Sequence, residues 1–220
     1  MRKYLLWIAL VGIFHQAAHA QFVGIPREEF QPFYSPQMEA NWCWASSASM
    51  VMAYQGVPIP QINIVQHIKS VVVDATASEA EIVRAVNHVF NYTVDGSPAK
   101  IVMSGTYIPG APHPLVLYNQ LKQKKPVIMM YRRPDGGGHA VVVTGINATQ
   151  LPAGILVDQL HVFEPFAYRS TPFGPQFDAA LRYKNYSLYG MPYGMTLRQG
   201  GMEVGLIMGM ILMNSSINPA

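Results

Sequence analysis

The sequence predicts an α+β fold in a single domain, with helices in the first half of the chain and an antiparallel sheet in the second. Three observations favour this order. Apolar residues recur at helical spacing between residues 42 and 90, apolar runs rich in Val and Ile follow from residue 126, and no internal repeat or shift of composition divides the chain. With 220 residues, 50% of them hydrophobic and only 12% charged, the chain can bury a substantial core.

Residues 1–20 have the pattern of a secretory signal peptide. Arg2 and Lys3 precede an apolar run over residues 4–14, and Ala18-His19-Ala20 offers a cleavage site before Gln21. The apolar run is shorter than the roughly 20 residues that an uncleaved membrane anchor requires. We therefore expect residues 21–220 to be secreted or periplasmic, with no stable membrane insertion after cleavage.

Four helices are predicted after this leader. Residues 21–36 are expected to run extended over the surface, and the first helix then covers residues 42–55 and ends at Gly56. The second covers residues 61–73. The third covers residues 78–90, where Ser78 and Glu81 form a capping box. A loop rich in Gly and Pro over residues 96–112 leads to a short fourth helix at residues 114–124.

Strands are predicted from residue 126 onward. Apolar runs at residues 126–131, 139–146 and 160–163 have the length and β-branched content of strands, and Pro165 ends the last of them. Residues 204–213 are too short to span a membrane and fit a buried final strand. Residues 166–201 are rich in Tyr, Gly and Pro, which indicates irregular or short-stranded structure.

Cys43 is the only cysteine of the chain, so no internal disulfide can form. Exported proteins mostly use Cys in disulfides, and a solitary thiol there risks oxidation, which favours a catalytic role over an inert buried one. Cys43 stands at the start of a predicted helix, where unpaired N–H groups and the helix dipole favour an anion. Given a nearby cation, such a position lowers the pKa of Cys from about 8.5 to between roughly 3.5 and 7.5.

His139 is the predicted base for this thiol, because it begins a strand directly after Gly136-Gly137-Gly138 and a strand fixes the imidazole firmly. Gln37, six residues before Cys43, is the predicted side-chain donor to an oxyanion, with the backbone N–H of Cys43 as second donor. The remaining histidines lie in the leader, on predicted helices, in a Pro-rich loop or inside a strand: His15, His19, His67, His88, His113 and His161.

Two blocks of sequence resemble a known family. Residues 37–47, Gln-Met-Glu-Ala-Asn-Trp-Cys-Trp-Ala-Ser-Ser, resemble the oxyanion-glutamine and nucleophile block of papain-fold cysteine peptidases. The Asn-Trp-Cys-Trp-Ala form is similar to the bacterial branch that includes the AvrRpt2-type and C39-like peptidases. Residues 138–146 resemble that family's histidine strand, and residues 124–128 the start of the strand before it.

This resemblance covers about residues 37–165. It implies a papain-like two-lobed fold, in which an N-terminal helical half carries Cys43 and a C-terminal antiparallel sheet half carries His139. The cleft between the halves would bind an extended chain. On this basis residues 21–220 are expected to form one papain-like cysteine peptidase domain.

The third catalytic residue departs from the family pattern, which places Asn or Asp on the strand after the histidine strand, often before Pro. Here Glu164 precedes Pro165. Glu can accept the Nδ1–H hydrogen bond that orients an imidazole, although its extra methylene demands a small backbone shift. Asp158, Asn147 and Asn185 remain alternatives.

The expected chemistry is acyl transfer from a peptide or protein substrate through a Cys43 thioester, with no metal or organic cofactor. No H-E-x-x-H motif or thiolate cluster suggests a metal site, and a formal charge of +3, without a basic stripe, gives no indication of nucleic-acid binding. Two rival functions stay open: acyl transfer to an amine, as in transglutaminase-like enzymes, and a non-catalytic binding or effector protein with the same fold. Substrate preference and oligomeric state are not readable from the sequence.

Overall fold

The structure, a computed structural model, describes residues 19–94, 97–189 and 195–219 and has an α+β fold. Its helices are α1 (Arg27–Phe30), α2 (Cys43–Tyr54), α3 (Gln61–Lys69), α4 (Glu79–Val86) and α5 (Pro114–Lys122), with 3₁₀ turns η1 (Gln31–Phe33) and η2 (Ala179–Leu181). Its strands are β1 (Gln21–Gly24), β2 (His88–Val94), β3 (Ser97–Pro109), β4 (Val127–Arg132), β5 (Gly138–Leu151), β6 (Gly154–Phe163), β7 (Tyr168–Thr171), β8 (Gly174–Phe177), β9 (Tyr183–Tyr189), β10 (Thr196–Gln199) and β11 (Met202–Pro219).

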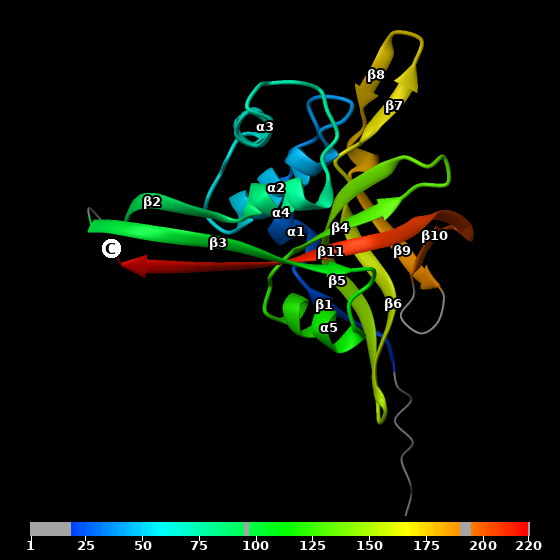
Figure 1. Ribbon diagram of the computed structural model, residues 1–220. Helices are drawn as coiled ribbons and strands as arrows, with labels where there is room; N and C mark the ends of the chain where they lie inside the picture. Colours follow the sequence, from blue (N-terminus) through cyan, green and yellow to red (C-terminus); the bar gives the residue numbers. More distant parts are fainter. Residues whose placement is uncertain (1–18, 95–96, 190–194, 220) are drawn as a thin grey trace, which may run out of the picture.

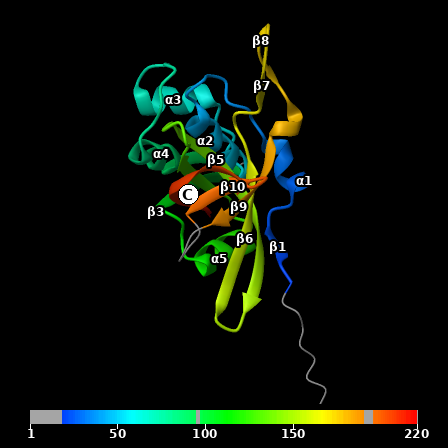
Figure 2. The same ribbon diagram turned by 90° about the vertical axis from the view of Figure 1, so that its right-hand side faces the viewer.

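Nine of these strands form one antiparallel sheet that closes on itself. The order along it is β1-β5-β6-β9-β10-β11-β3-β2, and β4 pairs with both β11 and β5. Strands β4, β5, β6, β9, β10 and β11 therefore make a closed circuit. Helices α2, α3 and α4 lie together on one side of it, α5 lies on another, and β2, β3 and the end of β11 extend away from the body as an arm (Figure 1, Figure 2).

Strands β4 and β5 separate two hydrophobic cores. Ile128 and Met130 face the core shared with the helices, whereas Val127, Met129 and Tyr131 face the core inside the closed circuit. Successive side chains of a strand point to opposite faces, so both faces of β4 are buried. This explains why the predicted strands appear in the sequence as continuous apolar runs and not as an alternation of apolar and polar residues.

The sequence predictions hold for most elements. Helix α2, the capping box of α4, the short helix α5, and strands β4, β5, β6 and β11 all occur where they were expected. Residues 166–201 contain the predicted short strands. Among the described residues, no helix combines the length and the apolar character needed to cross a bilayer.

Four expectations about local structure are wrong. Helix α3 ends at Lys69 because Ser70 takes a left-handed conformation, so residues 71–73 are loop. Helix α4 ends at Val86, and residues 88–94 form β2. The predicted loop at residues 96–112 is mostly β3, which pairs with β2 and β11. The segment expected to run over the surface contains β1 and α1, and its Ile25 and Phe30 are fully buried.

Candidate active site

Cys43 is the first residue of α2, with Trp42 at the N-cap and no capping side chain. The backbone N–H groups of this first turn have no partner within the helix, so they and the helix dipole favour negative charge on the sulfur. Trp44 through Met52 are buried, which fixes the helix in the core, while Cys43 itself is half-buried. The thiol is thus held rigidly but remains accessible.

His139 lies on β5, directly opposite Tyr131 of β4. The two rings meet edge to face with centroids 5.4 Å apart, and the imidazole side chain is only 8% exposed. Gly136 in the preceding turn has a φ of 86°, a backbone conformation that favours glycine. The turn and the tyrosine ring together fix the direction of the imidazole.

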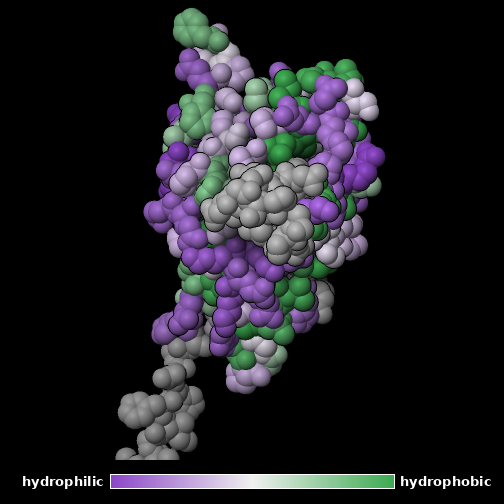
Figure 3. Space-filling model, turned by 90° about the vertical axis from the view of Figure 1, so that its left-hand side faces the viewer, coloured by the Kyte–Doolittle hydropathy of each residue, from purple (hydrophilic) through white to green (hydrophobic). Residues whose placement is uncertain are grey.

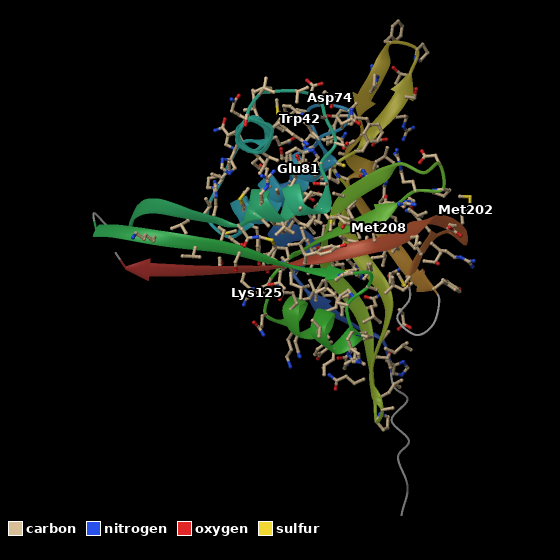
Figure 4. All side chains as sticks on the ribbon, in the orientation of Figure 1. Trp42, Asp74, Glu81, Lys125, Met202 and Met208 are labelled. Atoms are coloured by element: carbon tan, nitrogen blue, oxygen red, sulfur yellow. The ribbon has the colours of Figure 1, made fainter. Side chains whose placement is uncertain are left out.

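The Cys43 side chain lies close enough to the His139 imidazole to help raise the pKa of that imidazole. Both line one pocket of about 440 Å³ between the helices and the sheet. Its remaining walls come from the segment around Cys43, the loop before α4, α4 itself, the turn before β5, and β4, β5 and β11: Asn41, Trp44, Thr76, Ala77, Ser78, Glu79, Ile82, Met130, Tyr131, Arg132, Gly136, Gly138, Ala140 and Met208. In Figure 4, Met208 lies on β11, apart from Trp42 and Asp74 of the helical side.

Glu164 directly follows β6 and contacts the His139 imidazole. Its carboxylate is 2% exposed, and its Oε1 is 2.5 Å from His139 Nε2. Because a carboxylate only accepts hydrogen bonds, Nε2 carries the proton and Nδ1 is left for the thiol. The expectation of an Nδ1–H contact to Glu164 is therefore wrong in its choice of nitrogen.

Three further donors satisfy the Glu164 carboxylate. The Phe166 N–H donates to Oε1 at 2.9 Å, Lys184 Nζ donates to Oε2 at 3.1 Å, and the Tyr186 hydroxyl lies 3.4 Å from Oε2. Neither Lys184 nor Tyr186 was singled out from the sequence. Both come from β9, in a segment whose residue pattern gave no signal for this site.

The buried pair is held in its charged form. Burial alone lowers the pKa of His139, but the Glu164 charge and hydrogen bonds with Cys43 and Glu164 outweigh it and raise this pKa to about 9. Burial alone raises the pKa of Glu164, but the charge and hydrogen bond of His139, together with Lys184, lower it to about 2. An imidazolium is thus available beside Cys43 near neutral pH, as thiolate formation requires.

Gln37 is buried in the loop before α2. Its Nε2 donates to the carbonyls of Glu39 and Ala40, each at 2.8 Å, and its Oε1 has no hydrogen-bond partner among the described residues. It does not line the pocket. An oxyanion contact from this amide requires that one of the two carbonyls be released, so the predicted role stays a prediction.

The alternatives for the third residue lie elsewhere. Asn147 bonds His161 and Gln159, Asp158 is 3.4 Å from the Thr149 hydroxyl, and Asn185 is exposed on β9. None of these three has a hydrogen bond to His139 among the described residues. Of the four candidates, the structure brings only Glu164 to the imidazole.

The loop between α3 and α4 is tied to the segment around Cys43. The indole N–H groups of Trp42 and Trp44 donate to the carbonyls of Val73 and Ala75, at 2.9 and 3.0 Å. Asn41 adds two hydrogen bonds to the Asp74 carboxylate. The tryptophans that flank the thiol therefore hold a loop whose next residues, Thr76 and Ala77, form one wall of the pocket.

Metal binding has no support in the described part of the chain, where no group of three His, Cys, Asp or Glu side chains is placed to hold an ion. The donors around the thiol are instead those of a Cys–His–acid arrangement. Acyl transfer through a thioester is the chemistry that this set of groups can perform.

Comparison with known proteins gives the family of the chain. A family model described as the Peptidase_C39 like family matches residues 29–172, more than half of the 220 residues. The match includes Gln37, Cys43, His139 and Glu164. A search of curated proteins gave no match. The chain belongs to the Peptidase_C39 like family, and so to the papain-like cysteine peptidases.

Proposed function

We propose that the chain is an exported cysteine peptidase that hydrolyses peptide bonds through a Cys43 thioester. One observation carries the proposal: Cys43 of α2 and His139 of β5 line one pocket, and the imidazole bonds the buried carboxylate of Glu164, which directly follows β6. Family membership supports the same reaction class.

In the proposed mechanism the Cys43 thiolate attacks the scissile carbonyl while His139 is protonated. The oxyanion is stabilised by the Cys43 N–H and, as the sequence predicts, by the Gln37 amide. The C–N bond then breaks, and His139 donates its proton to the leaving amine. Neutral His139 next removes a proton from water, which attacks the thioester, and the thiol leaves with that proton.

The two sides of the pocket support the papain-like two-lobed arrangement. The N-terminus of α2, the residues before α4 and α4 itself supply one wall, and β4, β5 and β11 supply the other. Cys43 thus comes from the helical side and His139 from the sheet side. A groove between two such walls suits an extended polypeptide as substrate.

Figure 3 shows hydrophilic and hydrophobic residues interspersed over the visible face. Export is proposed from the pattern of residues 1–20, of which residues 1–18 lie outside the described part of the chain. Thioester chemistry by itself requires no cofactor.

The first test is Cys43→Ala in the chain that begins at Gln21, assayed against a peptide library. Loss of all turnover with an unchanged circular dichroism spectrum is expected, because no other thiol exists to form the acyl-enzyme. Ser47→Ala is the matched control: it lies one turn further along α2, and its buried hydroxyl has no hydrogen-bond partner among the described residues. Turnover that survives Cys43→Ala would refute the proposal.

Two further measurements distinguish peptide hydrolysis from the two rival functions, acyl transfer to an amine and binding without catalysis. Product masses with and without an added primary amine distinguish hydrolysis from amine acylation. Rapid alkylation of Cys43 by iodoacetamide near pH 6 is expected for a thiolate paired with an imidazolium. Slow alkylation, as for an ordinary thiol, would favour a binding protein that keeps only the fold.

A further inference from the structure

We propose that Lys184 is a positioning residue of this site, a fourth member of the chain Cys43–His139–Glu164 that keeps the Glu164 carboxylate ionised and aimed at the imidazole. This inference rests on the proposed function for its role in turnover. The geometry behind it stands independently of the substrate.

The two carboxylate oxygens of Glu164 are divided between separate partners. Oε1 faces His139 Nε2 and the Phe166 N–H, and Oε2 faces Lys184 Nζ and the Tyr186 hydroxyl. An ion pair on one oxygen fixes the rotation of the carboxylate and so the direction of the other oxygen. Lys184 can therefore orient the imidazole through Glu164 without touching the thiol.

Lys184 is placed for this contact by strand pairing. It lies opposite Val162 in the register of β6 and β9, and the Glu164 N–H donates to the carbonyl of Arg182, the residue just before β9. The lysine side chain is 23% exposed, whereas that of Glu164 is 2% exposed. The ammonium group therefore reaches the buried carboxylate from the more exposed side of the pair.

A buried carboxylate needs a compensating charge, because desolvation of an unpaired ion costs several kcal/mol. His139 supplies that charge only while it is protonated. In the acyl-enzyme His139 has given its proton to the leaving amine and is neutral. Lys184 then remains as the cation paired with Glu164, so the carboxylate stays ionised when His139 must act as a base.

Other titratable groups around Glu164 do not replace this cation. Besides Lys184 they are Tyr34, Cys43, Tyr131, His139, Arg182 and Tyr186. Arg182 contacts Glu164 through its backbone carbonyl. Among the described residues, only His139 and Lys184 form an ion pair with this carboxylate.

Removal of the lysine charge should shift the pH profile of Cys43 reactivity in a direction that can be predicted. The loss of a cation favours protonation of every neighbouring acid and base. In Lys184→Met both limbs of the pH profile of Cys43 reactivity should therefore move to higher pH, by about one unit for an ion pair of this kind. A purely structural role would instead lower reactivity by the same factor at every pH.

The experiment measures iodoacetamide alkylation of Cys43 and peptide kcat/KM between pH 4 and 10. The variants are Lys184→Met, Lys184→Gln as a second neutral variant, and Lys184→Arg, which keeps the charge. Lys125→Met is the control, because Lys125 is half-buried, bonds Asn214 and lies far from the pocket (Figure 4). We expect an upward shift in the neutral variants, a loss of kcat/KM of up to about 10-fold on the acid limb of the profile, and near-normal profiles for Lys184→Arg and Lys125→Met.

The outcomes separate this inference from the proposed function. Shifted alkylation profiles without any peptide turnover would support the role of Lys184 and contradict the peptidase. Turnover that depends on Cys43 but keeps its pH profile in Lys184→Met and Lys184→Gln would overturn the inference and leave the peptidase intact. A uniform loss in all three Lys184 variants would assign the lysine to folding alone.

Discussion

At the scale of single residues, the site combines side chains that the sequence could identify with others that it could not. Cys43 stands out as the sole cysteine, His139 by its glycine triplet, and Glu164 by the proline that follows it. Lys184 carries no such mark, because its contact with Glu164 depends on the register of β6 against β9. Local sequence patterns therefore indicate candidates for the catalytic residues, whereas the residues that pair with them are brought into place by strand pairing.

Gln37 is the residue whose role most needs a direct test. In Gln37→Ala we expect kcat to fall by about 10²–10³, the typical loss for one oxyanion donor, with KM little changed. The same substitution removes hydrogen bonds to the Glu39 and Ala40 carbonyls, so the free energy of unfolding should fall by about 1 kcal/mol. Steady-state kinetics and urea denaturation measure the two effects.

Gln61→Ala is a suitable control for this experiment. Gln61 is also buried and donates to the Pro36 carbonyl and the Ser35 hydroxyl in the same loop, and like Gln37 it does not line the pocket, but no oxyanion role is predicted for it. The Gln61→Ala variant should have a lower free energy of unfolding, with kcat nearly unchanged. If both variants lose kcat equally, Gln37 acts by bracing the loop and the oxyanion role is wrong.

At the scale of elements, prediction succeeds where the signal is local. The capping box of α4 and the apolar runs of β4 and β5 are set by neighbouring residues, and all three elements occur as expected. Strand β3 was missed because its Gly and Pro content is typical of a loop. It is instead paired along most of its length by β11, about a hundred residues later in the chain.

The loop between α3 and α4 forms part of the pocket wall, and its hydrogen bond to Trp42 can be tested. Trp42→Phe replaces the buried indole with a smaller phenyl ring and removes the N–H donated to the Val73 carbonyl. We expect a loss of more than about 1 kcal/mol in unfolding free energy, from the lost hydrogen bond and the cavity together, and a rise in KM that exceeds any fall in kcat, because Thr76 and Ala77 then shift at the pocket wall.

Tyr54→Phe is the matched control for this loop. It also deletes one donor from the helix α2, here to the Glu29 carboxylate, at a place that does not line the pocket. The Tyr54→Phe variant should lose about 1 kcal/mol of unfolding free energy, with KM unchanged. An unchanged KM in Trp42→Phe as well would show that the indole stabilises the fold without shaping the pocket.

At the scale of the whole molecule, the α+β order was predictable but the closure of the sheet was not. The sequence separates helices from strands along the chain, and this segregation puts Cys43 and His139 on different layers. Closure depends on β4 pairing with both β5 and β11. These contacts span the second half of the chain, so no local window of sequence contains them. The pocket forms where this closed circuit meets α2 and α4.

The buried His139–Glu164 pair also makes the stability of the molecule depend on pH. The pKa of Glu164 falls from 4.5 to about 2 on folding, so its contribution is present above pH 4.5 and is lost as pH falls toward 2. The pKa of His139 rises from 6.5 to about 9, so its contribution is complete below pH 6.5 and is lost as pH rises through 9. Both contributions are therefore complete only between about pH 4.5 and 6.5.

We expect Glu164→Gln to lower the free energy of unfolding by about 3 kcal/mol inside this window, since it breaks a buried ion pair. The deficit should shrink as pH approaches 9. Urea denaturation followed by the fluorescence of Trp42 and Trp44, both buried beside the site, gives the measurement. Glu29→Gln, which removes the exposed pair with Lys124, should cost less than 1 kcal/mol at every pH. A deficit in Glu164→Gln that stays constant from pH 5 to 9 would mean that His139 is not charged in the folded protein, and the thiolate–imidazolium pair would have no physical basis.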